Sequence, residues 1–118
     1  MADHFQMDGR AGARPGQRVM QLKGRLGLDT VQDFLKTVRA TAEPVIILDL
    51  NELSYIDSAG VGSLVQTFAS FRKSQRQLAL SGVNDRVRAV LDITRVSNLI
   101  PSYASVSDAE EKHIAPST

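Results

Sequence analysis

Short apolar runs alternate along the chain with apolar residues at helical spacing, and turn-forming residues separate them. The runs predict strands at 18–23, 45–50 and 78–80. Shorter signals predict a first edge strand within 4–8 and a last strand at 103–106. The run at 45–50 lacks polar alternation, which indicates a central strand covered on both sides. We expect Gly24 to end the second strand and Asn51-Glu52 to turn the chain after the central one.

Four helices are predicted between and after these strands. The first has Val31, Phe34, Leu35 and Val38 on one face, with Asp29 or Thr30 as its cap and capping-box spacing from Thr30 to Asp33. The second begins near Ala59 and repeats apolar residues to Phe71, and Asn84 caps the third. Ser107 with Glu110 resembles a capping box for a short last helix, and Val96, Leu99 and Ile100 are expected to pack before Pro101. Strands alternating with helices indicate an α/β layer fold.

Composition narrows the class of protein. A chain of 118 residues suits one domain, and we expect it to span 1–118 with flexible termini and fraying after Lys112. A formal net charge of +1 gives no basic stripe for nucleic acid or an anionic membrane. Cysteine is absent, which excludes disulfides and thiol chemistry. No apolar stretch is long enough to span a membrane and the start lacks a secretory pattern, so a cytoplasmic protein is expected.

The segment 54–64 carries the strongest functional signal. Asp57 is the natural cap of the second helix, and Ser58 then lies at the helix entrance with its hydroxyl toward solvent. Ala59, Gly60 and Gly62 are small enough for another chain to approach the backbone. The outer helix face is expected to carry Ser63, Gln66, Thr67 and Ser70, all polar and uncharged. From the residues alone, a docking surface and a plain capped helix start both remain open, because Ser and Asp are common caps.

The residues 45–50 followed by Ile56-Asp57-Ser58-Ala59-Gly60-Val61-Gly62 closely resemble STAS domains, the family of bacterial anti-sigma factor antagonists. Gly24-Arg25-Leu26, the run 78–82, and 87–94 followed by Leu99-Ile100 fall in the family's order, so the similarity covers about 16–111. The resemblance implies a single STAS-type domain. Its fold is then a small mixed β-sheet of four to five strands with helices packed mainly on one face.

The resemblance also implies a function. Ser58 would be the phosphoacceptor of an anti-sigma factor that is itself a serine kinase, and a PP2C-type phosphatase would restore the unmodified form. The unmodified antagonist would bind the anti-sigma factor and free a sigma factor for transcription. The partner-binding residues it implies are Asp57, Ala59, Gly60, Val61, Gly62, Ser63, Thr67, Arg25, Leu26, Ser81, Gly82 and Asn84.

Two residues depart from the family pattern. Arg95 stands after Thr94 where many members have glycine, so the turn after the third helix is expected to differ. Gly27 stands where a polar or acidic residue is frequent, in a loop that often touches the partner. These departures bear on which partner is bound, and leave the fold unaffected.

Enzymatic chemistry finds little support. The histidines, His4 and His113, lie near opposite termini, where we expect them solvated and unavailable as a base for a serine nucleophile. No grouping has metal-ligand spacing, and Gly60-x-Gly62 lacks the third glycine of a dinucleotide fingerprint. We therefore expect no cofactor and no metal.

Two alternatives stay open: a scaffold or accessory subunit of a stress-signalling or lipid-transport complex, and a small-ligand or nucleotide-binding module. Weak self-association is a further expectation.

Overall fold

The structure is a computed structural model, and it describes residues 4–116. Its elements follow one another as β1 (Gln6–Ala11), β2 (Gln17–Leu26), α1 (Val31–Arg39), β3 (Val45–Ile56), α2 (Ser58–Lys73), β4 (Gln77–Ser81), α3 (Asp85–Ile93), β5 (Ser102–Tyr103) and α4 (Val106–Lys112). The expected flexibility of the terminal residues 1–3 and 117–118 lies outside the described residues.

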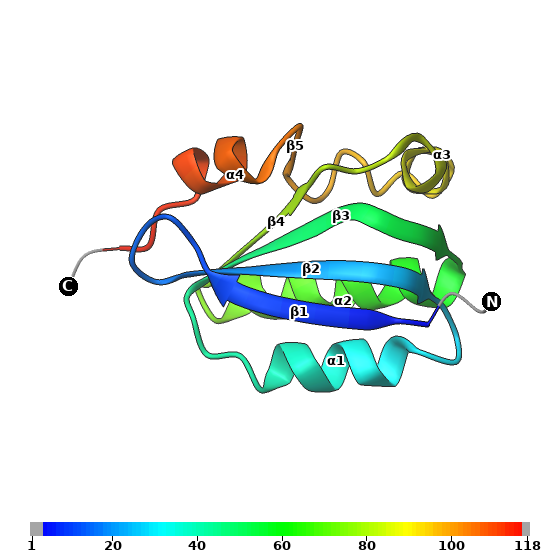
Figure 1. Cartoon of the computed structure of the whole chain (residues 1–118), viewed down its shortest axis with the longest axis horizontal. Helices are drawn as coiled ribbons and strands as arrows, with labels where there is room; N and C mark the ends of the chain where they lie inside the picture. Colours follow the sequence, from blue (N-terminus) through cyan, green and yellow to red (C-terminus); the bar gives the residue numbers. More distant parts are fainter. Residues whose placement is uncertain (1–3, 117–118) are drawn as a thin grey trace.

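The five strands form one sheet in the order β1-β2-β3-β4-β5. β1 pairs with β2 antiparallel, and the remaining neighbours are parallel, so the sheet is mixed as predicted. Helices connect the parallel strands, as crossover connections require. Figure 1 shows α1 and α2 on one side of the sheet and α4 on the other.

Two apolar clusters hold these layers together. The larger contains residues of β2, β3 and β4 on the side that faces α1 and α2, and α3 adds Val87 and Leu91 to it. The smaller lies on the opposite face, where Ala109 of α4 packs against Val19, Val45, Ile47 and Ala79. Three of the helices therefore share the main core, which confirms the expected one-sided packing, and α4 covers part of the other face.

Two expected strand ends are wrong. β2 continues through Gly24, whose φ is +86°, to Leu26, and β3 continues through Asn51-Glu52 to Ile56. The two strands pair along almost their full lengths, with register shifts between Gln21 and Lys23 and between Gly24 and Arg25. The register shifts accommodate the turn-forming residues, and the pairing of β2 with β3 continues beyond them. As a result, both strands reach the start of α2.

Several helix-end predictions also need correction. Thr30 precedes α1 but makes no side-chain cap; its hydroxyl instead accepts from the Gly27 N–H at 3.0 Å and donates to the Arg25 carbonyl at 2.8 Å. The cap of α4 is Ser105, which accepts from the Asp108 N–H at 3.1 Å, so Ser107 is not the cap. The predicted last strand is only Ser102–Tyr103. Leu99, expected to pack, is 45% exposed.

Arg95 occupies a left-handed turn after α3. Arg95 lies two residues after Ile93, the last residue of α3, and its φ of +64° is the left-handed conformation that glycine adopts freely. The Val96 N–H donates to the Leu91 carbonyl at 2.8 Å and the Arg95 N–H to the Asp92 carbonyl at 3.1 Å. These two bonds define a Schellman motif, which here forms without glycine. Gln75 ends α2 in the same way with φ +60°.

The chain after Lys112 is held to the sheet, so the expected fraying does not begin there. The side-chain amide of Gln17 donates to the carbonyls of Glu110 and His113, both at 2.8 Å. The imidazole of His113 lies 2.8 Å from the Tyr103 hydroxyl and 3.0 Å from Gln77 Oε1. His113 is half-buried, and this burial lowers the pKa of its ring. It is therefore a structural residue and not the solvated one expected, whereas His4 is exposed.

Across the described residues, no helix is both long and apolar enough to cross a membrane.

Candidate functional site at the start of α2

Asp57 ties the start of α2 to the loop between β2 and α1. Its Oδ1 accepts from the Gly60 N–H at 2.9 Å, which is the predicted helix cap. Its Oδ2 accepts from the Leu28 N–H at 3.2 Å. One carboxylate thus satisfies an amide of the helix and an amide of the loop, and it holds the two segments side by side.

Ser58, the first residue of α2, is exposed as predicted. The carboxylate of the preceding Asp57 bonds to the Gly60 and Leu28 amides, and the Ser58 side chain lies at the surface beside it. The N-terminus of a sixteen-residue helix attracts negative charge through its aligned backbone dipoles. The position therefore suits a group that gains an anionic substituent.

The glycines of the segment serve two different purposes. A Cβ built on Gly60 would lie 2.2 Å from the Leu26 carbonyl oxygen, so Gly60 lets α2 pack against the end of β2 in the same chain. At Gly62, which is exposed, an added Cβ meets nothing within 4 Å. The protein's own packing thus requires glycine at 60 and not at 62. Glycine weakens a helix interior by about 0.5–1 kcal/mol relative to alanine, so Gly62 is a costly choice unless something outside the chain approaches it.

Of the expected outer face of α2, Gln66 and Ser70 are exposed as predicted, whereas the prediction is wrong for Ser63 and Thr67. Ser63 and Thr67 are each 4% exposed, and their hydroxyls donate to the Gly60 carbonyl at 2.7 Å and the Ser63 carbonyl at 2.8 Å. A hydroxyl that donates to a carbonyl of its own helix can be buried without a further partner. The spacing of polar and apolar residues therefore does not show that such a residue is buried. The exposed residues of α2 between its start and Ser70 are Ser58, Gly62, Gln66, Ala69 and Ser70.

Of five other residues named for partner binding, three are buried and two are half-buried. Leu26 and Ser81 are 0% exposed, and Val61 is 6% exposed, so none of them presents a side chain to a partner. The Asn84 side chain caps α3 by accepting from the Val87 N–H at 3.0 Å, and its amide donates to the Leu53 carbonyl at 2.8 Å. Gly82 is half-buried in the left-handed region with φ +62°. Asn84 and Gly82 thus shape the chain after β4.

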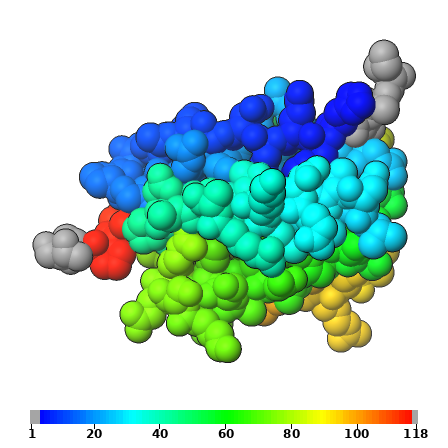
Figure 2. Space-filling view, turned by 90° about the horizontal axis from the view of Figure 1, so that it is seen from below, coloured from blue at the N-terminus to red at the C-terminus, as the bar shows by residue number. Residues whose placement is uncertain are grey.

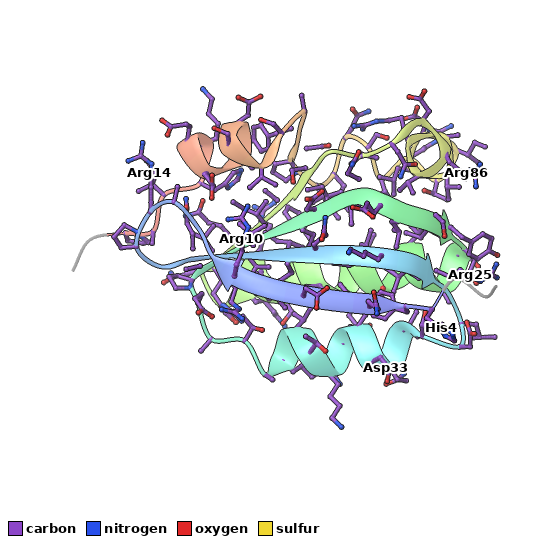
Figure 3. All side chains as sticks on the ribbon, viewed as in Figure 1. His4, Arg10, Arg14, Arg25, Asp33 and Arg86 are labelled. Carbon is purple, nitrogen blue, oxygen red and sulfur yellow. The ribbon has the colours of Figure 1, made fainter. Side chains whose placement is uncertain are left out.

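The structure adds two residues to this surface that sequence reasoning missed. Leu28 is 78% exposed in the loop bonded to Asp57, and Tyr55 is 37% exposed two residues before Asp57. The guanidinium of Arg25 lies 4.0 Å from the centre of the Tyr55 ring, a cation–π arrangement across two paired strands. Figure 3 shows Arg25 at the end of the sheet where β2 finishes. For Leu28 the sequence did offer a signal, because this leucine directly follows Gly27 and lies outside every predicted strand and helix.

We call Ser58, Ala59, Gly62, Arg25, Leu28 and Tyr55 the α2-entry surface. Its members come from the start of α2, the end of β2, the following loop and the end of β3. It combines an exposed hydroxyl, a cation and apolar area within one region.

No group of three or more His, Asp or Glu residues suited to a metal ion occurs among residues 4–116. His113 is not part of the α2-entry surface, because it bonds to Gln77 of β4 and Tyr103 of β5.

The family model of the STAS domain matches residues 9–109, and the chain belongs to this family. The anti-sigma-B factor antagonist of Listeria monocytogenes is 37% identical over 70 residues, which cover 59% of this chain and 61% of that protein. The match therefore spans less than two thirds of the relative's length.

Solved structures share the fold. The Bacillus anti-sigma factor antagonist SpoIIAA matches in its unphosphorylated form with a TM-score of 0.72 at 20% identity, covering 92% of this chain and 95% of that one. Its phosphorylated form matches with a TM-score of 0.67 at 19% identity, covering 92% and 98%. A sulfate transporter family protein from Wolinella succinogenes gives a TM-score of 0.74 at 19% identity, covering 83% and 84%. The fold thus occurs in proteins of more than one function.

Proposed function

We propose that this protein is an anti-sigma factor antagonist whose binding is switched by phosphorylation of Ser58. The unmodified protein binds an anti-sigma factor that is also a serine kinase, and so frees a sigma factor for transcription. A PP2C-type phosphatase reverses the modification. The cycle takes place in the cytoplasm, and the protein acts by binding and not as an enzyme.

The observation that carries this proposal is the exposed Ser58 hydroxyl at the first residue of α2. A kinase can reach it without unfolding the domain. Phosphorylation adds about −1.5 to −2 charges at neutral pH, and the N-terminus of a helix accommodates an anion well. A relative of the same fold has been solved in both phosphorylated and unphosphorylated forms, which supports a switch that leaves the fold intact.

The switch acts at the interface with the partner. In the unmodified form, the α2-entry surface offers a neutral hydroxyl beside the exposed Gly62, which lets a partner backbone come close. A phosphate on Ser58 would have to be desolvated against a partner surface matched to a hydroxyl. Burying an unpaired charge costs several kcal/mol, and about 1.4 kcal/mol already lowers affinity tenfold.

The other functions considered have less support. A scaffold or transport subunit shares the fold, as the transporter relative shows, but such a role gives no reason for the exposed Ser58 at the start of α2. A nucleotide site is not favoured by the two hollows nearest α1, α2 and α3. The hollow between α1 and α2 holds about 160 Å³, below the roughly 300 Å³ of small-molecule sites. The hollow beside Asn84 holds about 460 Å³, but two carboxylates, of Glu52 and Asp85, face one guanidinium, of Arg86, so its charge does not favour phosphates.

The test uses the kinase-type anti-sigma factor encoded in the same genome. Mass spectrometry after incubation with this kinase and ATP should find one phosphate, on Ser58. Ser58→Ala should bind the partner like the unmodified protein, and Ser58→Asp should bind at least tenfold more weakly. Ser70→Asp is the matched control, since Ser70 is exposed on the same helix, and it should bind normally. Equal affinities of the Ala and Asp variants at position 58 would overturn the switch.

A further inference from the structure

The outer edge of β1 has no neighbouring strand among the described residues. β1 and β5 are the outermost strands of the sheet, and β5 has two residues whereas β1 has six. Five of those six residues are exposed. Figure 2 shows β1 along the rim of the molecule, beside α1 and with no element outside it. An exposed edge of this length presents unpaired N–H and carbonyl groups to another strand.

Asp8 and Arg10 lie on the same face of this edge strand. They are two residues apart, and side chains alternate between faces along a strand. Arg10 pairs with Val19, which packs in the cluster beneath α4, so this is the α4 face of the sheet. Figure 3 shows Arg10 on that side of β1. Gly9, between them, is paired with Met20 and points to the other face, where the main core lies.

Arg10 is available to a further partner. Its Nη1 donates a long hydrogen bond of 3.3 Å to the Ala11 carbonyl and lies 3.9 Å from Glu110, at the outer limit of an ion pair, and its side chain is 60% exposed. Glu110 Oε2 already accepts from the Ala13 N–H at 2.8 Å. Asp8 is exposed as well. The edge thus carries an exposed carboxylate, of Asp8, and a largely solvated guanidinium, of Arg10, on the same face.

Symmetry allows few ways for two such strands to pair. In an antiparallel pair of identical strands, residue i of one copy lies opposite residue j of the other, and i + j is constant. Paired residues must point to the same face, so this constant is even. A pair centred on Asp8 puts two carboxylates opposite each other, and one centred on Arg10 does the same with two guanidiniums. A pair centred on Gly9 puts each Asp8 opposite the Arg10 of the other copy, twice.

We propose that two copies of this chain pair through β1 in an antiparallel register centred on Gly9. The backbone groups of the two edges then form one continuous ten-stranded sheet, and two Asp8–Arg10 pairs cross the junction on the α4 face. On the other face the Arg18 guanidinium of each copy lies over its own Gly9, where it fills the space that a Cβ would occupy. Opposite charges directly across two strands stabilise the pair, and like charges destabilise it. Registers centred on Met7 or Ala11 put Asp8 opposite Gln6 or Arg10 opposite Gly12, so the Gly9 register is the one that places Asp8 opposite Arg10.

The dimer is expected to be weak and salt-dependent. One pair of six-residue strands buries less than the roughly 1,000 Å² that stable interfaces exceed. A dissociation constant of about 0.1–1 mM is therefore expected, and exposed ion pairs are screened as salt rises. The edge is separate from the α2-entry surface, so this inference does not depend on the proposed function.

Sedimentation equilibrium from about 10 µM to about 1 mM tests the proposal across this range of dissociation constants. Asp8→Arg and Arg10→Asp each place like charges opposite one another and should weaken dimerisation about tenfold or more. The double variant with both substitutions restores opposite charges and should dimerise like the unmodified protein. A mixture of the two single variants should form heterodimers, because each then supplies the charges the other lacks. The double variant also controls for folding, since its composition is unchanged.

Two results would overturn the inference. One is an unmodified protein that stays monomeric up to about 1 mM, the top of the range in which the dimer is expected to form. The other is dimerisation that the single variants do not weaken, or that the double variant and the mixture do not restore. In that case the copies meet through another surface.

Discussion

Gly60 of α2 lies against the backbone of Leu26 at the end of β2, so close that a Cβ on Gly60 would be 2.2 Å from the Leu26 carbonyl oxygen. This contact sets how near the start of α2 comes to the sheet. It also brings Asp57 within reach of Leu28 in the next loop. The position of Ser58 therefore depends on a glycine two residues further along the chain.

Alanine at positions 60 and 62 should act in opposite directions. Gly60→Ala is expected to destabilise the fold by about 2–3 kcal/mol, because the new methyl group meets a carbonyl oxygen that cannot move freely. Gly62→Ala should stabilise it by about 0.5–1 kcal/mol, because the added methyl group meets nothing and alanine favours a helix. Urea unfolding measures both. Equal effects of the two substitutions would contradict the packing described for Gly60.

Gly62→Ala also tests the partner surface. If a partner backbone approaches α2 at Gly62, the variant should bind the anti-sigma factor more weakly although it is more stable. Gln66→Ala, a substitution at an exposed position one turn further along, serves as the control and should change binding less. Normal binding by Gly62→Ala would remove Gly62 from the α2-entry surface.

Removal of the Asp57 carboxylate should loosen the start of α2. Asp57→Ala leaves the Gly60 and Leu28 amides without their acceptor and should cost about 1–2 kcal/mol in the free energy of unfolding. In this variant, hydrogen exchange should become faster at the Gly60 and Leu28 amides. It should stay unchanged at the Val87 amide, which Asn84 caps at the start of α3. Unchanged exchange at Leu28 would mean that the bridge between helix and loop is not formed in solution.

Glycine at the two left-handed helix ends should stabilise the protein. Arg95→Gly and Gln75→Gly each relieve a positive φ that costs an L-residue roughly 1 kcal/mol, so each should raise the unfolding free energy by about that amount. Ser74→Gly is the control, because Ser74 has φ −91° and gains nothing from glycine. Thermal unfolding measures all three, and a loss of stability in Arg95→Gly would contradict the assigned backbone conformation.

His113 should make stability depend on pH. Its pKa is lowered in the folded protein because burial disfavours the charged ring, so the unfolded chain binds the proton more tightly. The neutral ring's contribution is complete above the unfolded pKa of about 6.5 and falls as the pH drops through the folded value. Urea unfolding at about pH 7.5 and 5.5 should show a smaller loss for His113→Gln than for the unmodified protein. His4→Gln, at an exposed position, should lose as much as the unmodified protein.

Local patterns in the sequence determined much of this protein. The apolar run 45–50 predicted the central strand, and the spacing of apolar residues predicted the helices. Asp57 and Asn84 were recognised as caps, because a cap depends on only three or four neighbouring residues. The Asp57-Ser58-Ala59-Gly60 motif led to the STAS family, and the exposure of Ser58 followed from its place at a helix start.

Only the tertiary structure decided what depends on contacts between distant segments. β3 runs past Asn51 because β2 pairs with it there, which overrides the local preference for a turn. Ser63 and Thr67 are buried because their hydroxyls bond back to α2, so polarity did not reveal their side of the helix. The role of Gly60 came from Leu26, thirty-four positions earlier, and the exposed Leu28 joined the α2-entry surface through Asp57. The sequence pattern determined which residue begins α2, whereas non-local packing determined which residues surround it.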